Sequence, residues 1–227
     1  MEKKEVEHQT KFLPIITGLF VAVLIISNIA STKIAEIGLL VLDAGTILFP
    51  LSYIFGDILT EVYGFKKARQ VIWTGFISLM IMSIVFFIVG LLPSAGGWEN
   101  QQAYDLILGV VPRIAIASMI AYFAGEFSNS YLLAKMKIIT KGKKLWARTI
   151  SSTIVGQGVD TLLFSVIAFY GVLPMDIFIT LIISNYIFKV GVEILFTPIT
   201  YQIVGFLKKQ EHQDVYDYKT NFSPFKI

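Results

Sequence analysis

Six stretches of mostly apolar residues, each about 20 residues or longer, divide the chain. A helix needs roughly 20 such residues to cross the hydrocarbon core of a bilayer, because each residue adds about 1.5 Å to its length. Only 15% of the residues are charged, too few to cover a water-facing surface. The sequence therefore predicts an all-α fold, a polytopic membrane protein built as a six-helix transmembrane bundle. Its spans are expected at 13–35, 45–65, 69–92, 112–134, 149–172 and 177–206.

Lysine and arginine residues set the predicted orientation, because they are enriched in the cytoplasmic loops of membrane proteins. With the N-terminus inside, all 19 basic residues fall in cytoplasmic segments except Lys33, Arg113 and Lys189. The predicted outer loops, 96–105 and 171–176, contain no basic residue. Removing or adding one span would scramble this alternation. The sequence thus predicts six spans with both termini in the cytoplasm.

The chain is expected to form one membrane domain with two short tails, because no linker is long enough to separate domains. The first apolar stretch lacks a small-residue cleavage site, so it is interpreted as a retained span. The stretch 93–112 is expected to hold a short interfacial helix, since Tyr104, Leu106 and Ile107 make it partly apolar. The predicted parts are a cytoplasmic tail at 1–12, the transmembrane domain at 13–206 and a polar, mobile cytoplasmic tail at 207–227.

Several kinds of chemistry are excluded by the residues that the chain lacks. There is no cysteine, which rules out disulfides, thiolate nucleophiles and cysteine-ligated metals. The two histidines, His8 and His212, lie in the polar tails. P-loop, nucleophile-elbow and H-E-x-x-H patterns are missing as well. We expect no catalytic residue, no metal and no cofactor. The basic segment 135–148 is what membrane topology alone requires, so no nucleic-acid partner is expected.

Polar side chains are concentrated on one face of five of the six predicted helices. An ionisable group at membrane depth costs about 2.5–3.5 kcal/mol on insertion scales, so it needs a partner, water or a function. Helical spacings of three and four place these residues on faces that are expected to meet in a shared centre. The residues predicted to bind a ligand there are Asn28, Tyr122, Glu126, Asn129, Gln157, Asp160, Phe164, Asn185, Tyr186, Lys189 and Glu193. A second set, expected to give polar support or gating, is Ser27, Tyr53, Asp57, Glu61 and Arg113.

Structural roles stay open for several of these charges. Asp57 and Glu61 lie near the basic loop 66–69, so a salt bridge with that loop is as consistent with the sequence as a substrate role. Lys189 is the only cation deep in the predicted bundle, and a purely structural ion pair would explain it equally well. Its expected partner is one of three carboxylates, Asp160, Glu126 or Glu193.

A centre lined by carboxylates, amides, one lysine and aromatic rings suits a small, flat ligand with several hydrogen-bond donors. Carboxylates accept from N–H groups, amides both donate and accept, and rings stack on flat ligands. Phosphate-rich ligands fit poorly, because only Lys189 reaches the centre. A carrier is the favoured class. An intramembrane aspartyl enzyme would need two facing aspartates, for which only Asp57 and Asp160 could be nominated.

Five blocks of sequence form recognisable motifs. They are SNIASTK (27–33), FPLSYIFGDILTEVYGFKKARQ (49–70), RIAIASMIAYFAGEFSNSY (113–131), WARTISSTIVGQGVDTLLF (146–164) and SNYIFKVGVEILFTPITY (184–201). The most specific elements are DILTEVYG followed by a basic cluster, and the G-Q-x-x-D-T pattern in the fifth span. Together these blocks strongly resemble the queuosine precursor transporter family, also called the vitamin-uptake-like family, over about residues 13–206.

The resemblance implies uptake of 7-deazaguanine bases across the bacterial inner membrane, for salvage into modified tRNA. The expected substrates are 7-cyano-7-deazaguanine, 7-aminomethyl-7-deazaguanine or queuine. Such a base presents N1–H and an exocyclic amine side by side, which one carboxylate can accept, and an O6 acceptor for an amide or lysine. We hypothesise that one carboxylate binds this edge and that an aromatic ring stacks on the base. The candidate carboxylates are Asp160, Glu126 and Glu193, and the candidate rings are Tyr122, Phe164 and Tyr186.

Three interpretations stay open at this point. The leading one is a stand-alone carrier that works by alternating access, energised by metabolic trapping or by protons. The second is the substrate-binding component of an energy-coupling-factor type vitamin transporter, which would need a partner ATPase. The third is an intramembrane enzyme or a structural membrane protein. The expected partners are a small-molecule substrate, the lipid membrane and, in one version, a second copy in a homodimer.

Overall fold

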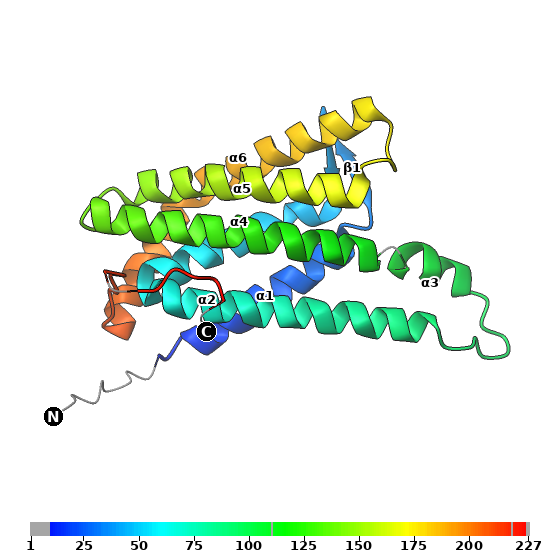
Figure 1. Cartoon of the computed structure of the whole chain (residues 1–227), viewed down its shortest axis with the longest axis horizontal. Coiled ribbons are helices and arrows are strands. Elements are labelled where there is room, and N and C mark those ends of the chain that lie inside the picture. The colour runs from blue at the N-terminus through cyan, green and yellow to red at the C-terminus, as the bar shows by residue number, and fades with distance from the viewer. Residues whose placement is uncertain (1–9, 110, 219, 226–227) are drawn as a thin grey trace.

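Helices dominate the structure, a computed structural model that describes residues 10–109, 111–218 and 220–225 (Figure 1). The N-terminal residues 1–9 of the predicted tail lie outside the described residues. Five of the helices, α1, α2, α4, α5 and α6, are long and apolar enough to cross a membrane. The elements in order are α1 (Leu13–Ala30), β1 (Ile34–Ile37), β2 (Leu40–Asp43), η1 (Ala44–Ile47), α2 (Phe49–Gly90), α3 (Gln101–Leu108), α4 (Val111–Ile139), α5 (Leu145–Phe169) and α6 (Met175–Glu211).

Burial in this bundle is reversed relative to a soluble protein. The side chains of Asp57, Glu126 and Gln157 have no exposed surface. Large aliphatic side chains face outward instead, with Leu195 74% and Ile81 57% exposed. Charged groups inside and aliphatic groups outside are stable only where the surrounding solvent is hydrocarbon. The structure therefore supports the predicted all-α polytopic membrane fold.

The helix α2 consists of two arms that run in opposite directions (Figure 1). The backbone leaves helical geometry at Gly64, where φ is 80° and ψ is 166°, a region open essentially to glycine. The ring of Phe49 lies 6.2 Å from that of Tyr122, and the ring of Phe76 lies 6.1 Å from that of Phe123. In a straight helix residues 49 and 76 would be about 40 Å apart, so they could not both contact neighbouring residues of α4. The predicted spans 45–65 and 69–92 are these two arms.

A small β-hairpin follows the first helix, and the all-α prediction missed it. The helix α1 ends at Ala30 rather than at the predicted 35, and β1 pairs antiparallel with β2 from Ile34 opposite Asp43 to Ile37 opposite Leu40. Gly38 allows the tight turn with φ of 63°. The hairpin packs beside α6. It leads directly into η1 and the first arm of α2, so a predicted loop is an ordered part of the bundle.

The other connections agree only partly with the prediction. The expected short helix within 93–112 is α3, and its Tyr104 hydroxyl donates to the Phe86 carbonyl at 3.2 Å. The start of α1 and the end of α6 meet, because the Glu211 carboxylate accepts from the backbone N–H of Phe12 at 2.6 Å. The prediction of a mobile C-terminal tail did not include the contacts of the described residues 213–218 and 220–225, which lie against the bend and second arm of α2 and the end of α4.

Candidate functional site

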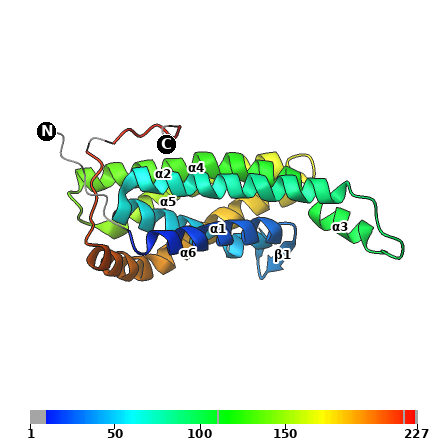
Figure 2. The same ribbon diagram turned by 90° about the horizontal axis from the view of Figure 1, so that it is seen from below.

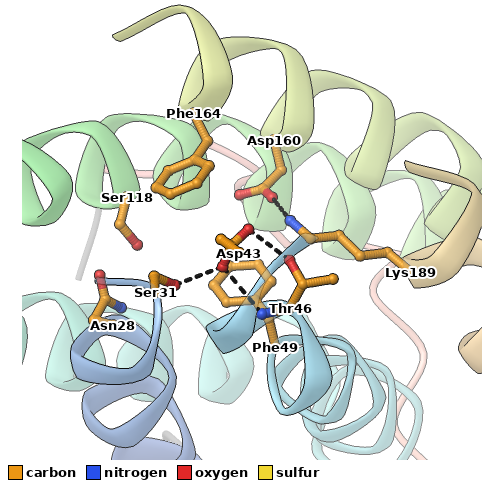
Figure 3. A pocket seen from close by; sticks show the side chains of 9 residues that line it. All are labelled: Asn28, Ser31, Asp43, Thr46, Phe49, Ser118, Asp160, Phe164 and Lys189. Carbon is orange, nitrogen blue, oxygen red and sulfur yellow. Dashed lines mark hydrogen bonds and ion pairs between the residues drawn. The ribbon is translucent and has the colours of Figure 1, made fainter. Parts of the chain in front are cut away.

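A small cavity lies between the helices close to the β-hairpin (Figure 3). Its volume of about 10 Å³ has room for the centre of one water molecule, so the cavity is closed to anything larger in this structure. Segments from every part of the bundle contribute to it, from the end of α1 to the first half of α6. The lining residues are Asn28, Ser31, Asp43, Thr46, Phe49, Ser118, Asp160, Phe164 and Lys189.

The cavity contains a buried pair of opposite charges. The Lys189 ammonium donates to a carboxylate oxygen of Asp160 at 2.9 Å, and both side chains are almost fully buried. The same ammonium lies 4.4 Å from the ring centroid of Phe49, a cation–π distance. Among the three partners that the sequence left open for Lys189, the structure selects Asp160. Burial makes this pair costly to break from one side only, because the remaining charge would be stranded.

Asp43 is the principal residue of this cavity that the sequence analysis missed. Its carboxylate accepts from the Ser31 hydroxyl at 2.7 Å, the Thr46 hydroxyl at 2.7 Å and the Asn185 amide at 3.0 Å. It therefore joins the end of α1, η1 and α6 at one point. Figure 3 shows the bonds from Ser31 and Thr46. The sequence D-A-G-T is a turn-capping pattern, confirmed by the Thr46 N–H bond to Asp43 at 3.1 Å. That local signal could not show that the loop folds inward over the bundle.

A second polar cluster lies further along the bundle. It consists of the three carboxylic side chains Asp57, Glu126 and Glu193, here together called the inner carboxyl group. The Asn129 amide donates to Asp57 at 2.8 Å, and Glu193 lies beside Asp57. Glu126 accepts from Ser130 at 3.3 Å. Neither carboxylate oxygen of Glu193 has a hydrogen-bond partner among the described residues. The predicted ligand-binding residues therefore divide between two places, and only Asn28, Asp160, Phe164 and Lys189 line the cavity.

The remaining predicted ligand contacts lie around these two places. The ring of Tyr122 packs against Phe49 below the cavity, and its buried hydroxyl has no partner among the described residues. Gln157 is fully buried, and its amide likewise makes no described hydrogen bond. Asn185 reaches the site through Asp43. Tyr186 is half-buried, donates to the Ile154 carbonyl at 3.3 Å and does not line the cavity.

The supporting residues have mainly structural contacts. Glu61 accepts from Arg148 at 3.0 Å and from Lys208 at 2.8 Å, and the Lys137 ammonium lies 3.6 Å from the same carboxylate oxygen. Its partners therefore come from α4, α5 and α6 rather than from the loop 66–69. The Ser27 hydroxyl and the Tyr53 hydroxyl each donate to a backbone carbonyl, at 3.0 and 3.3 Å.

Arg113 is exposed and lies apart from the cavity. Its guanidinium donates to the carbonyls of Ile167 at 3.0 Å and Tyr170 at 3.2 Å, at the C-terminal end of α5. A cation there complements the carbonyl groups that a helix end leaves unpaired. Its contacts therefore bind two helix ends together.

The cavity offers an acceptor and a donor side by side, flanked by two rings. The Asp160 carboxylate can accept two N–H groups, Lys189 can donate to an oxygen, and Phe49 and Phe164 present flat apolar surfaces. Among the described residues no group of three acidic or histidine side chains is arranged to hold a metal ion. Fold and site together define a multi-pass membrane protein that encloses a small polar cavity.

Comparison with known proteins gives this class a family. Residues 43–203 match the family described as "Putative vitamin uptake transporter". The "Probable queuosine precursor transporter" of Bacillus subtilis (strain 168) is 30% identical over 188 residues, 81% of this chain and 82% of that protein. The "Queuosine precursor transporter" of Escherichia coli (strain K12) is 26% identical over 67% of each chain. No solved structure matches the chain. The chain belongs to this vitamin uptake transporter family and is a multi-pass protein of a bacterial membrane.

Proposed function

We propose that the protein imports queuosine precursors, the 7-deazaguanine bases, across the bacterial inner membrane. Two relatives carry that activity in their names, and the residues of the cavity suit such a base. The edge of a deazaguanine carries O6, N1–H and the exocyclic amine in a row. Asp160 accepts from N1–H and the amine, while Lys189 donates to O6. The observation that carries this proposal is the 2.9 Å Asp160–Lys189 pair, which presents matching groups to that edge.

The base would separate the two charges by inserting between them, and each charge would keep a hydrogen-bonded partner. Phe164 and Phe49 flank the pair, so one of these rings stacks on the flat face of the base. A bicyclic base is far larger than the present cavity. Loading therefore needs the helices around the cavity to move apart, as alternating access requires.

Six spans with both termini in the cytoplasm fit the contacts of the chain ends. The start of α1 and the end of α6 are joined through Glu211, which supports a location on one side of the membrane. That arrangement requires an even number of crossings, and the five long helices supply six when the two arms of α2 count separately. The distribution of basic residues favours the cytoplasm for that side. The β-hairpin and the cavity then lie toward the outside, with the inner carboxyl group below them.

Uptake of radiolabelled 7-cyano-7-deazaguanine by cells tests the proposal. We expect Asp160→Asn to abolish uptake, although stranding Lys189 could also unfold the protein. The double variant Asp160→Asn with Lys189→Met removes both charges and should restore folding, measured by expression and thermal stability, without restoring uptake. Glu36→Gln is the matched control, since that carboxylate is exposed on the hairpin. Normal uptake by the folded double variant would contradict the proposal.

A further inference from the structure

The described C-terminal residues 213–218 and 220–225, here called the C-terminal strap, cross one end of the bundle (Figure 2). The chain reverses at His212, whose φ of 50° and ψ of 35° end α6 in a left-handed turn. The strap then passes the bend of α2 and the α4–α5 turn, where the Tyr216 hydroxyl lies against Gly142. This is the end of the bundle opposite the β-hairpin and the cavity.

The strap completes the bend of α2. A broken helix leaves carbonyls unpaired before the break and N–H groups unpaired after it. The Val215 N–H donates to the Val62 carbonyl at 3.4 Å, and the Asp217 carboxylate accepts from the Phe65 N–H at 3.0 Å. Asp217 thus caps the second arm as an N-cap residue would, although it lies about 150 positions further along the chain. The strap thus supplies hydrogen bonds to both arms at the bend, and these bonds stabilise the angle between the arms.

The strap also joins a cluster of charges at the inner ends of three helices. The Asp214 carboxylate lies 2.7 Å from the Lys137 ammonium and 2.9 Å from that of Lys208. Lys137 donates further to the carbonyl of Glu61, at 2.6 Å, and to that of Val215, at 2.7 Å. The strap is therefore tied to α2, α4 and α6 at once. Asp214 is 44% exposed, whereas the Lys137 side chain is only 2% exposed. Water can therefore solvate Asp214 when the strap leaves, while Lys137 keeps its contact with the Glu61 carbonyl.

The second half of the strap packs on the second arm of α2, which begins after Gly64. The Arg69 guanidinium donates to the carbonyls of Asn221 at 2.8 Å and Ser223 at 2.6 Å. The ring of Phe222 lies 5.0 Å from that of Phe65. These contacts hold the strap on one arm while Asp214 holds it to the ion cluster.

Buried polar atoms without described partners fill the space between the cavity and the strap. They belong to the inner carboxyl group and to neighbouring side chains on α5. In the membrane interior such atoms mark a route for a polar solute, because lipid cannot satisfy them. Along their helices these atoms lie between the Asp160–Lys189 pair and Glu61. Glu61 contacts Lys137 and Lys208, the two lysines that bind the strap. The atoms are Asp57 Oδ2, Glu126 Oε2, Thr153 Oγ1, the Gln157 amide and both Glu193 oxygens.

We infer that the C-terminal strap is the cytoplasmic gate of the transport route: docked, it closes the bend of α2 and the inner ion cluster, and undocked, it lets the inner carboxyl group face the cytoplasm. The inference rests on the proposed transport function, but its physical content is a change in accessibility that needs no substrate. Asp214 and Asp217 are the two side chains through which the strap engages helix ends and charges.

Single-cysteine labelling tests the gate, and the absence of natural cysteines makes this chain suitable for it. Thr153→Cys reports on the inner route, and Ser118→Cys reports on the cavity; both positions are buried. Each reporter is combined with the double change Asp214→Asn and Asp217→Asn, which keeps the size of both side chains and removes their two negative charges. Glu36→Gln is the matched control. A membrane-impermeant maleimide is added from the side that carries the C-terminus.

Labelling of the Thr153→Cys reporter should rise about tenfold in the double strap variant, the change in open population that 1.4 kcal/mol produces. The Ser118→Cys reporter and the Glu36→Gln control should not change. Unchanged labelling of Thr153→Cys would overturn the gate. An equal rise at both reporters would also overturn it, because it would mean general loosening. If the wild-type protein shows no deazaguanine uptake, by contrast, the proposed substrate is wrong, and the labelling result still supports the gate.

Discussion

At the scale of single residues, the charged, amide and hydroxyl side chains of the site form hydrogen bonds with one another. Asp43 shows how much one side chain can hold together, because its two oxygens accept from α1, η1 and α6. Helical spacing could place Asp160 and Lys189 toward the bundle centre from sequence. It could not place Asp43, because a carboxylate in a loop gives no periodic signal.

Replacing Asp43 with alanine should loosen the β-hairpin over the cavity. Four hydrogen bonds to the carboxylate are lost and the buried Asn185 amide is left without its partner, so we expect a loss of about 2–4 kcal/mol in stability. Thermal unfolding of the purified protein measures the loss. The Ser118→Cys reporter should then label faster from the hairpin side. Unchanged labelling would show that Asp43 does not hold the cavity closed.

Acidification should weaken docking of the C-terminal strap. Burial alone would raise the pKa of Asp214, but hydrogen bonds from Lys137 and Lys208 outweigh burial and hold that pKa below its ordinary value. A lowered pKa means that the carboxylate stabilises docking above pH about 4, and that this contribution is lost as the pH falls through the lowered pKa. Limited proteolysis of the strap between pH 7 and 3 measures this. The variant Asp214→Asn should start from weaker docking and lose less of it.

At the scale of secondary-structure elements, the sequence predicted the apolar helices well and their interruptions poorly. Hydrophobicity located all the long helices, since lipid exposure imposes one composition on the whole outer surface. The contacts of the described residues within the predicted tail 207–227 could not be anticipated, for a different reason. Its contacts with Phe65, Arg69 and Trp73 join residues about 150 positions apart, and no local pattern reports such pairing. The hairpin was missed because its strands are only four residues each.

The packing of α4 against α5 depends on two facing glycines. A Cβ on Gly125 would lie 2.7 Å from the Asp160 Cβ and 2.9 Å from the Gly156 carbonyl oxygen. Gly125→Ala should therefore push the helices apart and cost about 1–3 kcal/mol, despite the better helix propensity of alanine. Gly191→Ala is the matched control, because nothing lies within 4 Å of its added Cβ. Equal thermal stability of the two variants would contradict the close packing described here.

At the scale of the whole molecule, each end of the helix bundle is covered by a short non-helical segment. The β-hairpin covers the cavity at one end and the C-terminal strap covers the ion cluster at the other, with buried polar groups between them. The sequence analysis anticipated a shared polar centre, and Asn28, Asp160, Phe164 and Lys189 do line one cavity. It could not divide the predicted residues between that cavity and the inner carboxyl group, because their depth depends on how the helices are shifted against one another.

Proteoliposomes that contain only this protein should accumulate the labelled base until the concentrations inside and outside are equal, or beyond that if protons drive uptake. This outcome is expected for a stand-alone carrier with its own route and closures. A requirement for added subunits and ATP would instead identify the chain as the binding component of a larger transporter. Empty liposomes and liposomes with the Asp160→Asn, Lys189→Met variant serve as controls.

Direct binding of 7-cyano-7-deazaguanine to the purified protein tests the central claim most directly, namely that one base inserts between Asp160 and Lys189. Calorimetry should give a single site in the wild-type protein. An analogue that lacks the exocyclic amine should bind about tenfold more weakly or worse, since an acceptor of Asp160 would be left unpaired. The folded Asp160→Asn, Lys189→Met variant should not bind measurably. Equal affinity of that variant and the wild-type protein for the base would contradict the account.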